Sequence, residues 1–119
     1  MIKIIFYRNK SGVVCGFKMT DHAESRVCSA VSALALNTAN SIEAFTEADI
    51  EAEYDESGGF LRFTLVESDG KLDENAVLLL ASLELGILSI ASQHSGEISV
   101  SYKNIRMQKI KSGNKFKSV

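Results

Sequence analysis

The pattern of apolar and polar positions along the chain changes between a period of two and a period near 3.6. Alternation of apolar with polar residues predicts five strands, over 2–7, 13–19, 47–55, 61–65 and 98–103. Apolar residues three and four apart predict a helix lying on a core over 24–45. A second helix is predicted over 73–92, with Asp73 as its N-cap.

These elements follow one another in the order β-β-α-β-β-α-β. Turn signals at 9–12 and 57–59 join neighbouring strands closely, which favours antiparallel pairing and leaves the helices to cover the sheet. The predicted fold class is therefore α+β, a two-layer arrangement of a mainly antiparallel sheet with two helices. A length of 119 residues fits a single domain, which we expect over 1–106, followed by a basic and flexible tail over 107–119.

The second predicted helix is unusually apolar. Between 77 and 90 apolar residues cover nearly its whole circumference, and Glu84 is the only charged residue there. A helix that packs on a sheet by one face needs an apolar stripe of only about 100°. The surplus apolar surface can pack against the first helix or against another subunit. We expect a homodimer, with the helix over 73–92 as its contact.

Composition and motifs exclude several classes of protein and site. The longest nearly uncharged run, 76–91, is shorter than the roughly 20 residues that cross a bilayer, so no membrane partner is expected. Residues 1–10 lack the order of a signal peptide, which favours a cytoplasmic location with Cys15 and Cys28 as thiols. No glycine-rich phosphate loop and no paired metal-ligand spacing occurs, so no cofactor and no metal is expected.

The charge is unevenly distributed, although its net value is only -2. Six of the 13 Lys and Arg residues lie in 103–119, where there is no acid, and the rest of the chain is acidic. Acids alternate with apolar residues over 47–55, so this predicted strand has one acidic face. The basic end can contact rRNA, but nothing else in the sequence supports that contact, and such a run is more often simply solvated.

Cys28 and His22 are the candidate reactive residues. Cys28 falls in the first or second turn of the first predicted helix, where the positive end of the macrodipole favours thiolate over thiol. His22 lies on the preceding turn, where it can form a nucleophile–base pair with Cys28. Asp21 and Glu24 fit a variant of the capping box, and Ser25 is another candidate cap.

Small residues beside Cys28 predict a shallow groove along the first helix. The helical wheel places Ser29, Ser32, Ala35 and Ala39 beside Cys28, and we expect the substrate to contact Ser29, Ser32 and Ala35. A thiol at the rim of such a groove, with a histidine nearby, has the parts of a Cys–His protease site. The same placement also fits a buried helix thiol and a loop histidine, and spacing alone leaves both interpretations open. Cys15 lies in the middle of a strand and fits a small apolar side chain.

The segment 21–43, DHAESRVCSAVSALALNTANSIE, resembles the signature of the ribosomal-processing cysteine proteases, the Prp family of bacteria. Family members carry a histidine–alanine pair at the end of a strand and a cysteine that opens the next helix, and His22–Ala23 and Cys28–Ser32 match these features. The likeness covers the whole chain in length and element order. In three respects the chain departs from the family pattern: Asp21 stands in place of the usual glycine, Ser25 in place of an aspartate, and the loop between histidine and cysteine has only five residues.

The resemblance implies a cytoplasmic cysteine endopeptidase over 1–106 that removes a short N-terminal extension from a protein of the large ribosomal subunit. Cys28 would be the nucleophile and His22 the general base and acid, with Asp21 or Glu24 as candidates for orienting the histidine. The implied partner is the N-terminal peptide of that ribosomal protein. The alternative is a non-catalytic, ribosome-associated dimeric binding module, whose acidic face over 47–55 contacts basic ribosomal proteins.

Overall fold

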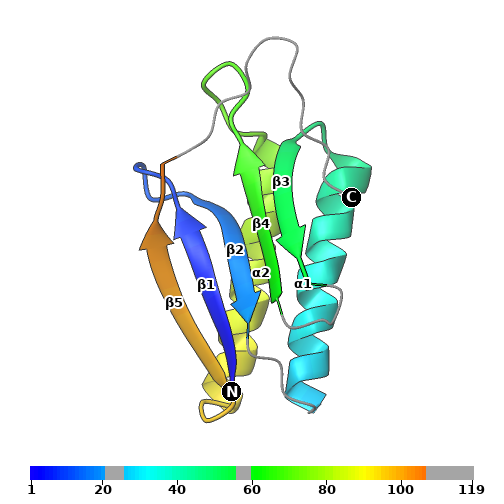
Figure 1. Ribbon diagram of the computed structural model, residues 1–119, viewed down its shortest axis with the longest axis vertical. Helices are drawn as coiled ribbons and strands as arrows, with labels where there is room; N and C mark the ends of the chain where they lie inside the picture. The colour runs from blue at the N-terminus through cyan, green and yellow to red at the C-terminus, as the bar shows by residue number, and fades with distance from the viewer. Residues whose placement is uncertain (21–25, 56–59, 107–119) are drawn as a thin grey trace.

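The computed structural model describes residues 1–20, 26–55 and 60–106, and Figure 1 shows how their elements are arranged. The elements follow the order predicted from the sequence, and the α+β class with a mainly antiparallel sheet is confirmed. They are β1 (Ile2–Arg8), β2 (Val14–Thr20), α1 (Arg26–Phe45), β3 (Asp49–Tyr54), β4 (Phe60–Val66), α2 (Glu74–Gln93) and β5 (Ile98–Asn104).

The strands form one sheet in the order β3-β4-β2-β1-β5. The pairs β1–β2, β2–β4 and β3–β4 are antiparallel, and β5 joins β1 in parallel. Strands β3 and β5 are therefore the two edges of the sheet. Helix α2 lies behind the sheet and contacts α1, which runs alongside the edge strand β3 (Figure 1).

The core lies between the sheet and the two helices. Strand register pairs Phe6 with Phe17 and Phe17 with Phe63, so three buried rings lie in a row across the sheet. The ring centroids of Phe17 and Phe63 are 5.8 Å apart. Burying a side chain of this size stabilises the fold by about 1.5–3 kcal/mol. Helix α1 adds its own buried stripe to this core: Val27, Cys28, Val31, Ala35, Thr38 and Ile42.

Strands β2 and β4 approach each other closely at Gly16. A Cβ atom at this position would lie 2.5 Å from the carbonyl oxygen of Phe63 and 2.9 Å from the Cα of Thr64. Both contacts are with backbone atoms, which cannot move aside as the end of a flexible side chain can. Glycine is therefore required at position 16 for this strand pairing.

Helix α2 begins where the sequence predicts it. The carboxylate of Asp73 accepts a hydrogen bond from the N–H of Ala76 at 2.9 Å, which confirms the predicted N-cap. One face of α2 is buried in the core, but Leu78 and Leu85 are 68% and 73% exposed. By length and composition alone, α2 is the one described helix that could cross a membrane. The nearly uncharged run within it, 76–91, is shorter than the roughly 20 residues that cross a bilayer, so the sequence predicts no membrane span.

The acidic face predicted over 47–55 lies on the side of the sheet that faces away from the helices. Glu51 and Glu53 are there, and Arg62 on β4 forms ion pairs with both carboxylates. Such exposed pairs stabilise a fold by at most about 1 kcal/mol, but they neutralise part of the acidic charge.

Candidate active site

Cys28 lies in the first turn of α1, as its place in the sequence predicts. Helix α1 begins at Arg26, so Cys28 is its third residue. The first four N–H groups of a helix have no acceptor within the helix, and the positive end of the macrodipole favours negative charge beside them. The side chain of Cys28 is 6% exposed and packs within the core cluster. The thiol is thus more deeply buried than a residue at the rim of an open groove would be.

The proposed partners of Cys28 lie just before α1. Asp21, His22, Glu24 and Ser25 lie outside the described residues, so the pairing of His22 with Cys28 and the capping roles of the other three stay predictions. The other histidine of the chain, His94, lies at the end of α2.

His94 forms the C-cap of α2. Its backbone N–H donates to the carbonyls of Ile90 and Ala91, and its Nδ1 lies 3.1 Å from Oε2 of Glu97.

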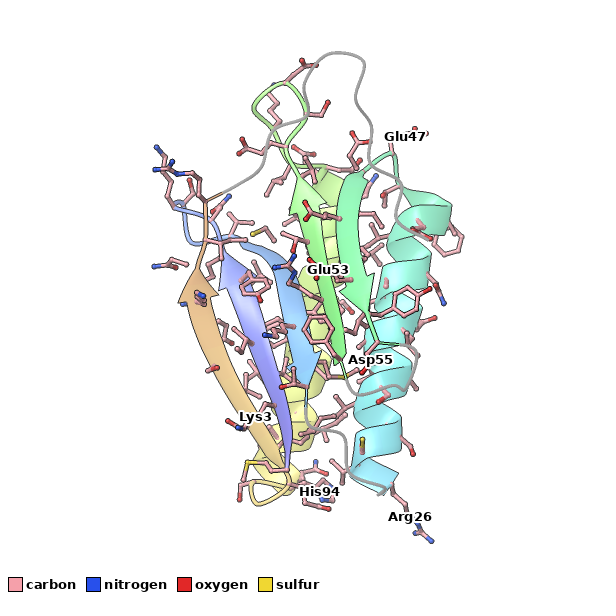
Figure 2. The ribbon with its side chains drawn as sticks, in the orientation of Figure 1. Lys3, Arg26, Glu47, Glu53, Asp55 and His94 are labelled. Carbon is pink, nitrogen blue, oxygen red and sulfur yellow. The ribbon has the colours of Figure 1, made fainter. Side chains whose placement is uncertain are left out.

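A groove of about 310 Å³ opens between α1 and the adjoining edge of the sheet. Figure 2 shows Arg26 at the start of α1 and Asp55 at the end of β3, next to the middle of the helix. From α1 the groove is lined by Ser32, Leu36, Ala39, Asn40 and Glu43. From the strands and their ends it is lined by Met19, Ile50, Ala52, Tyr54, Asp55, Phe60, Leu61 and Phe63.

The groove has an apolar floor and a partly exposed mouth. Leu61 and Phe63, which form part of its floor, are buried, whereas Leu36 and Tyr54 are 51% and 54% exposed. Among the described residues that line the groove, Glu43 and Asp55 carry ionisable carboxyl groups, and none of these residues is a lysine or an arginine. A side chain entering it therefore meets an apolar surface with acidic groups nearby.

The groove only partly coincides with the one expected from the sequence. Ser32 and Ala39 line it, but Ser29 is exposed and Ala35 is 1% exposed within the core, and neither of these two is among the lining residues. At about 100° per residue, Ala35 points toward the buried stripe of α1 and so cannot face an open groove. Leu36 and Glu43 were not expected at the groove, although with Ser32 and Ala39 they form one face of α1 at helical spacing.

Cys15 occupies a different environment on β2. Its side chain is fully buried, and its Sγ donates a weak hydrogen bond to the carbonyl oxygen of Tyr7 at 3.6 Å. Burial raises the pKa of the Cys15 thiol to about 11, because the charged form would lose its hydration. The predicted role of Cys15 as a small apolar side chain is confirmed.

Metal-ligating residues do not gather anywhere in the part of the chain that the structure describes. Within residues 1–20, 26–55 and 60–106, no three His, Cys, Asp or Glu side chains are close enough to hold an ion together. The chemistry available to the described residues around α1 is that of a thiol at a helix N-terminus beside an apolar groove.

Comparison with known proteins identifies the family to which the chain belongs. The model of the cysteine protease Prp family matches residues 1–99. The Staphylococcus aureus ribosomal processing protease Prp, solved with a covalently linked product peptide, is 27% identical with a TM-score of 0.78, covering 87% of this chain and 100% of that chain. The same protease solved with a substrate peptide is 26% identical with a TM-score of 0.76, with the same coverage.

A third solved structure, of a Streptococcus mutans protein, is 27% identical with a TM-score of 0.74, covering 88% of this chain and 99% of that chain. No curated protein sequence matches the chain. The family match spans most of the chain and includes the first turn of α1 and its cysteine. The chain therefore belongs to the Prp family of cysteine proteases.

Proposed function

We propose that this protease removes a short N-terminal extension from a protein of the large ribosomal subunit. The observation that carries the proposal is the family match over 1–99, which includes a cysteine in the first turn of α1. The similar Staphylococcus aureus enzyme is a ribosomal processing protease that has been solved with substrate and product peptides. The reaction belongs in the cytoplasm, because ribosomal subunits are assembled there.

Cys28 is the nucleophile in this proposal, and His22 is the general base and acid. The sulfur forms a bond to the scissile carbonyl carbon while His22 takes the thiol proton. Backbone N–H groups of the first turn of α1 donate hydrogen bonds to the developing oxyanion. The peptide C–N bond then breaks, and the proton passes from His22 to the leaving amine. Water, activated by His22, finally hydrolyses the thioester.

Access to the thiol requires a local movement in this mechanism. The side chain of Cys28 is 6% exposed, whereas a nucleophile must come within about 3–3.5 Å of the carbonyl carbon. Substrate binding beside the first turn of α1 therefore has to displace the groups that cover the sulfur. Catalysis then depends on how easily this part of the molecule opens, as well as on the thiol itself.

The experiment is cleavage of a large-subunit ribosomal protein that carries its N-terminal extension, followed by mass spectrometry. We expect the unaltered protein to release the extension and Cys28→Ala to be slower by roughly 10³- to 10⁶-fold, as for other nucleophiles of this kind. Cys15→Ala is the matched control, and it should retain the rate within a few-fold. Equal cleavage by Cys28→Ala and the unaltered protein would contradict the proposal.

We also propose that two copies of the chain associate through α2. Its outward stripe contains Leu78, Leu85 and Leu88, which are 68%, 73% and 41% exposed. Covering these side chains with the same stripe of a second copy removes apolar surface from water. Sedimentation should show a dimer that Leu85→Lys converts to a monomer, whereas Phe45→Lys, at an exposed position on α1, leaves it a dimer.

A further inference from the structure

Strand β3 has one backbone edge that no strand pairs with among the described residues. The N–H of Asp55 donates to the carbonyl oxygen of Phe60 at 3.0 Å, which makes these two residues a hydrogen-bonded pair across β3 and β4. In an antiparallel ladder such pairs alternate along the strand. Glu53 and Glu51 therefore also direct their N–H and C=O groups toward β4.

The alternate residues Ile50, Ala52 and Tyr54 direct their N–H and C=O groups away from β4, toward the free edge. The side chains of these same three residues line the groove beside α1. Apolar side-chain pockets and a row of available backbone donors and acceptors thus occur at one place. This is the combination by which sheet edges bind extended peptides.

The groove begins close to Cys28 and has the length of a short peptide. Ser32, its first residue on α1, comes four residues after Cys28, which corresponds to about 6 Å along a helix. From Ser32 to Glu43 the helix advances about 16 Å, the span of about five residues of extended chain. On the helical wheel Cys28 lies within about 40° of both Ser32 and Ala39, at the border between the buried stripe of α1 and the face that lines the groove.

We propose that the substrate chain binds as an added strand on the free edge of β3 and inserts a bulky apolar side chain into the α1–β3 groove. This binding mode depends on the proposed function, because a protease must hold an extended chain across its nucleophile. The inserted side chain lies a few residues from the bond that Cys28 attacks. Glu43 and Asp55 at the groove favour a substrate segment with lysine or arginine over one with acids.

Binding can be measured without cleavage in the Cys28→Ala protein. The probe is a fluorescein-labelled peptide of twelve residues with one phenylalanine among Ala, Ser and Lys, followed by fluorescence anisotropy. Ala39→Phe fills the groove from α1 and should weaken binding at least tenfold. Ala44→Phe is the matched control, because Ala44 is exposed on the same helix and does not line the groove. Equal affinity of the Ala39→Phe and Ala44→Phe proteins would overturn the proposal.

Strand addition has its own test, on both the peptide and the protein. N-methylation of alternate peptide amides removes donors to β3, and one of the two alternating sets should weaken binding at least tenfold while the other does not. Ala52→Pro removes an N–H that points away from β4, which an edge strand tolerates, and should also weaken binding. Thermal unfolding of the Ala52→Pro protein establishes that it is folded. Indifference to both N-methylated sets would overturn strand addition.

Further outcomes separate this binding mode from the proposed function and from other occupants. If Cys28 cleaves the ribosomal precursor and Ala39→Phe leaves its kcat/KM unchanged, the binding mode is wrong and the function stands. If the probe binds in the groove as described and the precursor is not cleaved, the function is wrong. Should Phe116→Ala in the full chain strengthen probe binding tenfold, the groove is held by the chain's own terminus and the proposal is overturned.

Discussion

The two cysteines of this chain lie in regions that have opposite demands on a thiol. Cys15 is the second residue of β2, next to Gly16, where two strands approach closely, and its side chain is fully buried. Cys28 is in the first turn of α1, where helix N–H groups without intrahelical acceptors favour negative charge. Both side chains are buried, so exposure alone does not distinguish the two thiols. Their backbone surroundings do, because Cys15 lies in a paired strand and Cys28 in the first turn of a helix.

Alkylation should separate the two thiols by the largest factor. Burial raises the pKa of Cys15 to about 11, so almost none of it is thiolate at pH 7.5. We expect iodoacetamide to modify Cys28 on the order of 100-fold faster than Cys15, with the Cys15→Ala and Cys28→Ala proteins reporting one thiol each. Adding His22→Ala should slow the reaction of Cys28. Equal alkylation rates for the two thiols would show that their environments do not make Cys28 more reactive than Cys15.

Substitution in the β2 region should reduce stability and leave the chemistry intact. Gly16→Ala introduces a Cβ 2.5 Å from the carbonyl oxygen of Phe63, and we expect it to lower the free energy of unfolding by about 1–3 kcal/mol. Gly96→Ala is the control, because its Cβ would meet nothing within 4 Å, and it should change stability by less than about 0.5 kcal/mol. Urea denaturation measures both. Identical urea midpoints for the two variants would mean that β2 and β4 can move apart around the added Cβ without loss of stability.

A further expected effect is a pH dependence that belongs to Cys15. The thiol pKa rises from an ordinary value of 9.0 to about 11 in the folded protein, so the unfolded chain releases this proton first as pH increases. The stability that the buried thiol contributes is therefore fully present below pH 9 and is lost as pH rises to 11.

The advantage in unfolding free energy of the unaltered protein over Cys15→Ala should fall by roughly 2–3 kcal/mol from pH 8 to pH 11. Urea titrations of both proteins at several pH values measure this difference, and the comparison removes the contribution of other groups that titrate in this range. A constant difference would show that Cys15 ionises as readily in the folded state as in the unfolded chain.

Much of the fold follows from local pattern. Alternation defined the strands, and the carboxylate of Asp73 was recognisable as an N-cap because a single side chain makes that contact. The strand order was not predictable in the same way. Nothing in the periodicity of residues 98–103 states that β5 joins β1 in parallel, because alternation records which face is buried and not which strand is the neighbour.

The candidate site was predictable at Cys28 and less so at its groove. The place of Cys28 in α1 follows from the boundary of the helix, and the family resemblance adds His22, which lies outside the described residues. The groove requires knowing that α1 lies along the edge strand β3, since Tyr54 contributes to it from β3 and Leu36 from α1. Residues that meet only through tertiary packing leave no common signal in a single sequence.

The direction of β5 has a practical consequence for handling the enzyme. This strand ends at Asn104, at the end of the molecule opposite to the first turn of α1, whereas the N-terminus lies at the same end as that turn (Figure 1). A surface-immobilisation handle attached at the end of β5 therefore starts at the end of the molecule far from the first turn of α1. The same handle fused before Met1 starts at the end that holds this turn, so assays of turnover are best run with the handle on the β5 side.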